Sequence, residues 1–197
     1  MKTQGLTFKQ IQKKLSGKRV GIAGAGGLGS NCAVALARVG LGNLVIADFD
    51  IVSEGNLNRQ YFFYEQIGEK KVVALKENIR RINGNINVED FDLKLNADDI
   101  LRIFKNCDVI VEAFDLAEMK QMILETVLDR LPETPIVTGL GMAGWGDNGS
   151  IHYRNEGMLH ICGDEKTEIA EDIPPLAPRV GMVANMQANT VLEILLK

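Results

Sequence analysis

A chain of 197 residues, 46% hydrophobic and 24% charged, is long enough to bury one substantial core and has the composition of a globular domain. Its net charge of −4 gives no broad basic surface, so nucleic acid is not expected as a partner. The uncharged run 20–37 holds five glycines, which predicts a strand, a loop and a helix start and not a membrane span. The start of the chain lacks the apolar core of a secretory signal, so we expect a cytoplasmic protein.

Patterns typical of strands and helices alternate along the first two thirds of the chain. Short apolar runs predict strands, and apolar residues three or four positions apart predict amphipathic helices. In chain order, the expected elements are a helix at 8–15, a strand at 19–23, a helix at 30–39, a strand at 43–47, a helix at 69–82, a strand at 87–93, a helix at 97–104, a strand at 108–113, a helix at 116–131 and a strand at 136–138. This alternation predicts an α/β, Rossmann-like, doubly wound and mainly parallel sheet.

The pattern changes after residue 138. A glycine-broken loop is followed by two strands that are expected to pair antiparallel and by a closing helix, at 150–154, 158–162 and 179–196. We therefore expect a single domain over 1–197, with a nucleotide-binding part at 1–138 and a less regular part at 139–197.

A glycine-rich segment joins the first strand to the second helix. Backbone amides of such a segment can approach a phosphate closely, and the helix start adds partial positive charge. Its glycines are Gly24, Gly26, Gly27 and Gly29. Asp48 ends the next strand, where a carboxylate can accept a hydrogen bond from a ribose hydroxyl. A glycine turn without a ligand is the alternative, but the strand, helix and acid in register favour a nucleotide.

Cationic side chains after this segment distinguish between nucleotides. The string Asn56-Leu57-Asn58-Arg59-Gln60 is followed by Lys71. A dinucleotide's pyrophosphate needs little beyond the glycine loop, whereas a triphosphate carries more charge and suits a bidentate arginine and a lysine. Arg59 and Lys71 therefore favour ATP over the NAD of a dehydrogenase, although either alone could be a solvated surface charge.

Asp115 follows the predicted strand at 108–113 and precedes a helix. Ligands bind at the carboxyl ends of parallel strands, and Mg²⁺ prefers one or two carboxylates together with phosphate oxygens. We therefore expect Asp115 to hold magnesium. Two alternatives stay open: Asp115 could cap a helix that starts at Leu116, and Glu112 is a weaker candidate for the metal contact.

Five motifs stand in the order seen in one protein family. They are Gly24-x-Gly26-Gly27-x-Gly29-Ser30, Asp48-Phe49-Asp50, Asn56-Leu57-Asn58-Arg59-Gln60, Gly68-x-x-Lys71 and Glu112-Ala113-Phe114-Asp115. Through them the chain resembles the ThiF/MoeB/HesA family, the prokaryotic relatives of ubiquitin-activating enzymes, over nearly its whole length. It looks closest to the short ThiF type because of three further strings, Gly141-Met142-Ala143-Gly144, Cys162-Gly163-Asp164 and Ala177-Pro178-Arg179-Val180.

The resemblance implies an ATP-dependent adenylyltransferase that works as a homodimer. Its substrate would be the C-terminal glycine carboxylate of ThiS, a ubiquitin-like sulfur carrier protein with a Gly-Gly tail, activated for sulfur transfer in thiamine synthesis. Pyrophosphate would be released, and the segment 139–197 would face the carrier. The implied roles are ribose binding for Asp48, phosphate binding for Arg59 and Lys71, magnesium binding for Asp115, and further nucleotide contacts for Asp50, Asn56 and Gln60.

The sequence departs from the family in two places. Longer members carry two Cys-x-x-Cys pairs that bind zinc; the three cysteines here form no such pair, which predicts no zinc. Some members send an N-terminal arginine across the dimer to the partner's triphosphate. No arginine precedes Arg19 here, so only Lys9, Lys13 or Lys14 could replace it.

Two side chains of the last third have alternative roles. A thiolate at Cys162 could form a covalent link to the carrier or receive sulfur, as a cysteine does in parts of the family; the alternative is a buried cysteine at a strand end. Trp145 could be a docking aromatic, but we expect it to anchor its own loop. His152 and His160 are expected to be ordinary strand residues.

Adenylyl transfer to a carboxylate needs alignment and charge stabilisation more than a general base, because the carboxylate is already a nucleophile. Two other functions stay open: adenylylation of a small-molecule carboxylate in another cofactor pathway, and a non-catalytic module that binds the carrier. A dehydrogenase is the least favoured.

Overall fold

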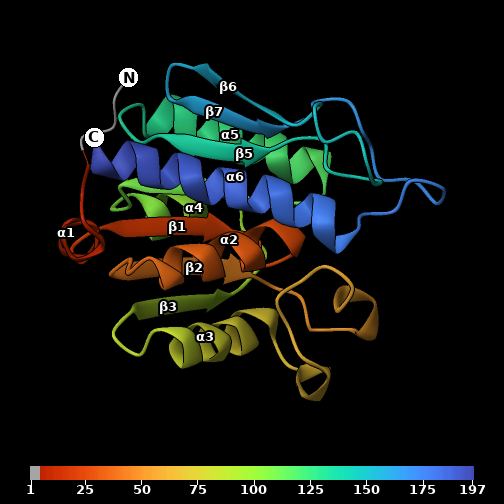
Figure 1. Cartoon of the computed structure of the whole chain (residues 1–197), viewed down its shortest axis with the longest axis horizontal. Coiled ribbons are helices and arrows are strands. Elements are labelled where there is room, and N and C mark those ends of the chain that lie inside the picture. The colour runs from red at the N-terminus through yellow and green to blue at the C-terminus, as the bar shows by residue number, and fades with distance from the viewer. Residues whose placement is uncertain (1–4) are drawn as a thin grey trace.

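The computed structural model describes residues 5–197 and contains the alternation of strands and helices that the sequence predicts (Figure 1). Residues 1–4, which belong to the segment expected to lack a secretory signal, lie outside the described residues. The strands are β1 Arg19–Ala23, β2 Asn43–Asp48, β3 Asn87–Asp92, β4 Val109–Glu112, β5 Ile136–Gly139, β6 His152–Glu156 and β7 Leu159–Gly163. The helices are α1 Phe8–Leu15, α2 Gly27–Arg38, α3 Lys71–Ile82, α4 Ala97–Phe104, α5 Ala117–Arg130 and α6 Ala177–Leu196, with short 3-10 helices at Glu54–Asn56 and Tyr64–Gln66.

Seven strands form one sheet in the order β3-β2-β1-β4-β5-β7-β6. Each neighbouring pair is parallel except β6 and β7, which run antiparallel. β7 pairs parallel with β5, so only the edge strand β6 reverses direction. The predicted Rossmann-like, mainly parallel sheet with an antiparallel extension is confirmed.

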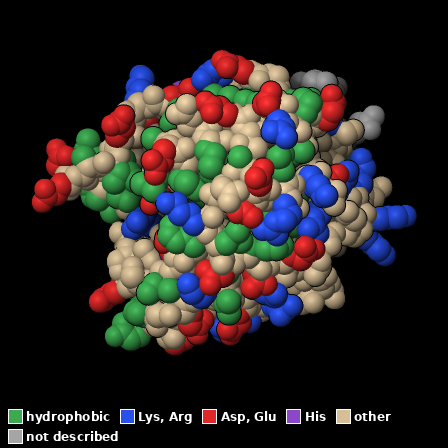
Figure 2. All heavy atoms as spheres, turned by 180° about the vertical axis from the view of Figure 1, so that it is seen from behind, with side chains coloured by type: hydrophobic (Ala, Val, Ile, Leu, Met, Phe, Trp, Pro, Cys, Tyr) green, Lys and Arg blue, Asp and Glu red, His purple; other side chains and the backbone are tan. Residues whose placement is uncertain are grey.

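Helices cover both faces of the sheet, with α2, α3 and α6 on one face and α4 and α5 on the other (Figure 1). Neighbouring residues of β2 serve the two cores in turn: Leu44 and Ile46 pack under the first group of helices, and Val45 and Ala47 pack under the second. Figure 2 shows the α4–α5 side, where acidic, basic and hydrophobic side chains are interspersed. Within residues 5–197, no helix has the length and apolar character needed to cross a membrane.

The carboxyl ends of β1, β2, β4, β5 and β7 meet at one edge of the sheet, because these strands are parallel. The glycine-rich turn follows β1, Asp48 ends β2, Asp115 follows β4, and Asp164 follows β7. Open α/β sheets bind their ligands at this edge. The fold therefore collects most of the predicted site residues in one place.

Four elements have boundaries that differ from the sequence-based expectation by two or three residues: α2, α3, β6 and α6, which begins at Ala177 and not at 179. α2 begins at Gly27 and not at 30. The first amides of a helix have no partner within the helix, so its first turn can consist of glycines, which the sequence pattern indicates as a loop. α3 begins at Lys71 and not at 69. β6 lies two residues later than expected; all of its side chains are exposed, so no buried residue marks its register in the sequence.

Candidate active site

The glycine-rich turn between β1 and α2 is packed on itself. Gly24 has a φ of +100°, which favours glycine, and its carbonyl oxygen would lie 1.8 Å from a Cβ atom on Gly29. Both positions must therefore lack a side chain. Gly26 is the N-cap residue of α2, and within the described chain no side chain caps this helix. The first amides of α2 are thus left for an anion at the carboxyl edge of the sheet.

Asp48, at the end of β2, faces this turn. Its Oδ2 accepts a hydrogen bond from the Ala25 amide at 2.6 Å, and its Oδ1 accepts one from the Asp50 amide at 2.8 Å. Burial raises the pKa of Asp48, and the two amides and the charge of Lys71 oppose that rise in part. Each carboxylate oxygen keeps a second lone pair, which can accept a ribose hydroxyl.

Two backbone hydrogen bonds between the segments 50–52 and 69–71, here called the backbone clip, bring Lys71 close to Asp48 and Asp50. The Lys71 amide donates to the Asp50 carbonyl at 3.0 Å, and the Val52 amide donates to the Glu69 carbonyl at 2.8 Å. Lys71 is 5% exposed, and its Nζ donates to Asp50 Oδ2 at 2.8 Å. An ammonium group has three donors, so this pair fixes the lysine and leaves donors for a phosphate. Asp50 therefore orients Lys71, while its expected direct contact with the nucleotide stays a prediction.

Arg59 lies over the first turn of α2. Its Cγ and Cδ would lie 3.6 and 3.8 Å from a Cβ atom on Gly27. Its Nη1 donates to the Gly55 carbonyl at 3.0 Å and to Asn58 Oδ1 at 2.7 Å. Nε and Nη2 have no acceptor among residues 5–197, so one edge of the guanidinium is left for an anion.

Two polar side chains of α2, for which the sequence predicted no role, hold the Arg59 loop. Asn31 Nδ2 donates to the carbonyl oxygens of Gly27 at 2.7 Å and of Arg59 at 2.9 Å. Ser30 Oγ accepts a hydrogen bond from the Tyr61 amide at 3.0 Å. They join the glycine-rich turn to the arginine, and their place directly after the glycines is the sequence signal that could have revealed them.

Asn56 and Gln60 differ in what they leave for a ligand. Asn56 Oδ1 accepts the Ser53 amide at 3.0 Å and so stabilises its own short helix. Gln60 is buried beside the turn, and its Nε2 would lie 3.8 Å from a Cβ atom on Gly26. Its Oε1 has no partner in the part of the chain that the structure describes. A buried polar atom without a partner is costly, so Gln60 is the stronger candidate for a nucleotide contact.

Asp115 is exposed in the turn between β4 and α5. α5 begins at Ala117 with Leu116 as its N-cap residue, and no side chain of the described residues caps it. The alternative that Asp115 caps this helix is therefore wrong. An open carboxylate at the carboxyl edge fits a magnesium ion that takes its remaining ligands from phosphate and water.

Glu112 is fully buried, and both of its carboxylate oxygens already accept hydrogen bonds from the protein. Its Oε1 accepts the Phe114 amide at 2.7 Å, and its Oε2 accepts Lys120 Nζ and Thr138 Oγ1. Lys120 also donates to the Gly139 carbonyl at 3.0 Å, so this network ties α5 to the ends of β4 and β5. A metal would have to break these bonds, which removes Glu112 as a candidate ligand.

Cys162 is fully buried in β7, and its Sγ lies 3.6 Å from Thr190 Oγ1 of α6. Burial raises the pKa of this thiol to about 11, and the contact with Thr190 opposes the rise only in part. A nucleophilic cysteine needs exposure and a lowered pKa. The geometry therefore favours packing over a covalent role for Cys162.

Trp145 does not anchor its loop, as the sequence led us to expect, because its side chain is 84% exposed. His152 and His160 are strand residues of β6 and β7, as predicted.

Lys14 on α1 donates to the Leu196 carbonyl at 3.3 Å, next to the C-terminal end of α6. Within residues 5–197, no three His, Cys, Asp or Glu side chains gather as a metal site.

The fold and this edge define a nucleotide-binding α/β protein with an anion site at a helix start and two cations beside it. The chain belongs to the ThiF family, whose model matches residues 2–197. The resemblance drawn from the sequence motifs is thereby confirmed.

Curated relatives agree with this assignment. The chain is 30% identical over 193 residues to the adenylyltransferase and sulfurtransferase MOCS3 of Caenorhabditis briggsae. The aligned region covers 94% of this chain and 48% of that protein. It is 31% identical over 189 residues to the probable adenylyltransferase/sulfurtransferase MoeZ of Mycobacterium tuberculosis, with 93% and 45% covered. The chain thus spans about half the length of these relatives.

Solved structures share the fold. The E. coli tRNA N6-threonylcarbamoyladenosine dehydratase TcdA in complex with ATP matches with a TM-score of 0.86 at 19% identity, over 95% of this chain and 89% of that one. E. coli MccB with ATP matches with a TM-score of 0.72 at 22% identity, over 94% and 57%. At these identities the likeness establishes the architecture and not the reaction.

Proposed function

We propose that the chain is an ATP-dependent adenylyltransferase that activates the C-terminal glycine carboxylate of a ubiquitin-like sulfur carrier protein with a Gly-Gly tail. The supporting observation is that Asp48, Arg59 and Lys71 meet around the glycine-rich turn at one edge of the sheet. A dinucleotide needs the turn and the acid, whereas the two cations suit a triphosphate. The names of the relatives, which join adenylyl and sulfur transfer, agree with this choice.

In the proposed reaction the carrier's carboxylate attacks the α-phosphorus of ATP. The bond from that phosphorus to the bridging oxygen breaks, and pyrophosphate leaves with the bonding electron pair. Asp48 holds the ribose so that the α-phosphate stays in line, and Arg59 and Lys71 stabilise the charge that builds on the phosphates. The carboxylate is already ionised at neutral pH, so the site needs no general base. Cys162 takes no part because its thiol is buried and protonated.

Asp115 is the residue that would hold magnesium. Its open carboxylate fits one ligand position, and phosphate oxygens and water would supply the others. When bound, the ion would neutralise charge on the phosphates of ATP.

Within this class we propose ThiS of thiamine biosynthesis as the carrier, and a cytoplasmic homodimer as the working form. The support is the resemblance of three strings in the last third of the chain to the short ThiF type. This choice is finer than the family alone can give, and it requires a direct test.

Exchange of labelled pyrophosphate into ATP is that test. With magnesium and purified ThiS ending in Gly-Gly, we expect exchange; without the carrier, or with ThiS lacking its last glycine, we expect background. Exchange that needs a small acid and no carrier would move the proposal to a small-molecule carboxylate. Failure to bind ATP with magnesium would contradict the proposal and favour a non-catalytic module.

A further inference from the structure

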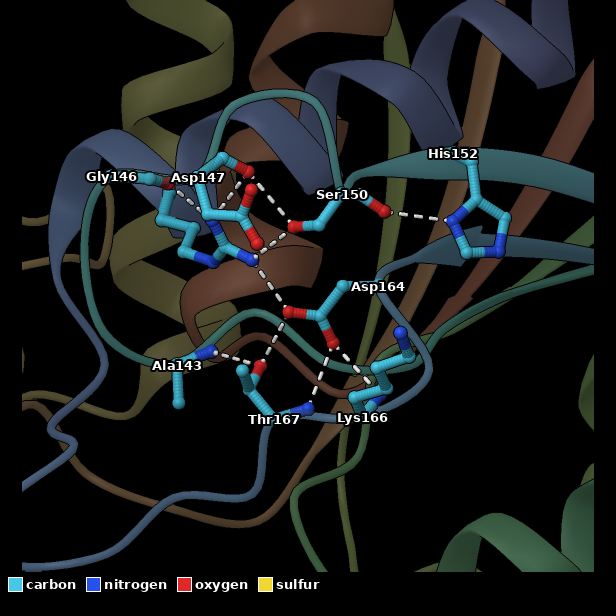
Figure 3. Close-up of polar contacts among 9 residues, drawn as sticks. Ala143, Gly146, Asp147, Ser150, His152, Asp164, Lys166 and Thr167 are labelled. Atoms are coloured by element: carbon cyan, nitrogen blue, oxygen red, sulfur yellow. Dashed lines mark hydrogen bonds and ion pairs between the residues drawn. The ribbon is translucent and has the colours of Figure 1, made fainter.

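A buried ion pair beside the nucleotide edge joins segments that are distant in the sequence. Arg179, in the first turn of α6, and Asp164, directly after β7, are 4% and 2% exposed. Arg179 Nη2 donates to Asp164 Oδ2 at 2.5 Å and to Ser150 Oγ at 2.9 Å, and Nη1 donates to the Gly146 carbonyl at 2.6 Å. Figure 3 shows Asp164 at the centre of these contacts. We call the Arg179–Asp164 pair the latch.

Asp164 also fixes the start of the segment 165–176, here called the strap, which leads from β7 to α6. Asp164 Oδ1 accepts the amides of Lys166 and Thr167, both at 2.8 Å, and Oδ2 accepts Thr167 Oγ1 at 2.8 Å (Figure 3). Burial raises the pKa of Asp164, but the hydrogen bonds from Thr167, Lys166 and Arg179 outweigh burial and hold that pKa far below its usual value. The latch is therefore a full ion pair at neutral pH.

The loop 140–150, which follows β5, lies against the strap. The Gly144 amide donates to the Pro174 carbonyl at 2.9 Å. A cavity of about 220 Å³ lies between loop and strap, with Trp145 and Arg179 among its lining residues. The latch thus holds both walls of this cavity.

The latch lies next to the glycine-rich turn. Val180, the residue after Arg179, has its Cγ1 2.9 Å from the position of a Cβ atom on Gly27. The start of α6, which carries Arg179, therefore packs against the first turn of α2, beside the anion site. The ribose position at Asp48 lies on the β2 side, so the side of β5 and β7 is left for the second substrate.

We propose that the latch is a positioning pair, which holds loop and strap together so that the carrier's tail meets a preformed route to the α-phosphate. This inference rests on the proposed function. A guanidinium can donate to several acceptors at once, whereas a lysine is a point charge. Loss of Arg179 releases the loop and the strap, so the KM for the carrier rises. The KM for ATP changes little, because the contacts of ATP lie at Asp48, Arg59 and Lys71.

Three variants test the latch in carrier-dependent pyrophosphate exchange. Arg179→Met removes the charge, Arg179→Lys keeps the charge but not the planar guanidinium, and Arg102→Met removes an exposed arginine of α4 that pairs with Asp99 at 2.6 Å, away from loop and strap. For Arg179→Met we expect the KM for ThiS to rise about tenfold or more while the KM for ATP stays within about threefold. Arg179→Lys should be intermediate, and Arg102→Met, the matched control, should behave as wild type. An equal rise of both KM values in Arg179→Met would overturn the proposal.

Tryptic cleavage after Lys166 reports on the strap without any carrier. Under native conditions the Arg179→Met strap should be cut about tenfold faster than the strap of wild type or Arg102→Met, because local opening exposes it. Unchanged cleavage would also overturn the proposal. Thermal unfolding identifies any variant that does not fold, in which case Arg179→Lys carries both tests. If wild type shows no exchange with ThiS, the proposed function fails, and the latch is judged by cleavage alone.

Discussion

The two halves of the carboxyl edge are held together in different ways. On the nucleotide side, Lys71 is fixed by a backbone clip to Asp50, and Asp48 is fixed by amides of the neighbouring turns. On the other side, the guanidinium of Arg179 holds positions 15 to 33 residues away, in the loop and at the start of the strap. The first half is held by several separate contacts, of which Ala25–Asp48 and Lys71–Asp50 also span 23 and 21 residues, whereas the second half depends on the guanidinium of one arginine.

This difference predicts two kinds of sensitivity. Substitutions on the nucleotide side should change the rate of adenylyl transfer and leave the fold intact, because their cations face a ligand. Substitutions at the latch should change stability and carrier binding first, because the pair is buried within the protein.

The largest effect is expected for the stability of Arg179→Met. Removing the guanidinium leaves the buried Asp164 carboxylate without a positive partner, which lowers the free energy of unfolding by about 3–5 kcal/mol. Urea unfolding of Arg179→Met and of Arg102→Met, followed by circular dichroism, measures the difference. The exposed control should lose little; equal midpoints for the two variants would show that the latch does not stabilise the second half.

Arg59→Ala should have the next largest effect, on turnover. A donor aimed at charge that builds in the transition state is worth about 100-fold or more, so exchange should fall by that factor while ATP binding weakens only slightly. Exchange rates and ATP titrations of the same preparation separate the two. Arg38→Ala, which removes only a contact with the Tyr61 hydroxyl at 3.1 Å, is the matched control. Full exchange in Arg59→Ala would refute the assigned role.

Asp48 should give a smaller effect that depends on pH. Burial raises its pKa above the usual value of 3.8, so the folded protein binds this proton more tightly than the unfolded chain does. Wild type should therefore lose stability relative to Asp48→Asn as the pH rises from 3.8 through the raised pKa, and the difference should then stay constant. Melting temperatures of the nucleotide-free proteins across this range provide the measurement. Parallel curves would show that Asp48 is not desolvated.

The smallest effect is expected for Cys162→Ala. The thiol is buried and protonated, so exchange and formation of carrier adenylate should match wild type apart from a modest loss of stability. Cys107→Ala, at another buried thiol whose pKa is raised to about 11, is the control for that loss. A Cys162 variant that still exchanges pyrophosphate but no longer supports sulfur transfer would restore the covalent role.

The same division explains what the sequence could predict. The sequence predicts the glycine-rich turn, Asp48 and Lys71 as site residues because each stands at a fixed place in a strand–turn–helix pattern. Asp50, Ser30 and Asn31 stand close by, but their partners depend on the folded turn.

The second half gave no such pattern. Arg179 stood in a motif string, yet only the fold brings it to Asp164 and Gly146. Trp145 was wrongly expected to anchor its loop, because an aromatic residue between glycines has the same local sequence whether buried or exposed. The partner of Glu112 was also missed, since Lys120 reaches it from the next helix.

The chemical claim, that this site joins AMP to the terminal carboxylate of a protein carrier, can be measured directly by intact mass spectrometry. ThiS ending in Gly-Gly is incubated with the protein, ATP, magnesium and pyrophosphatase. The account predicts that the carrier gains the mass of one AMP, and that a carrier with an amidated C-terminus gains none. An unmodified native carrier, or AMP on the amidated one, would contradict it.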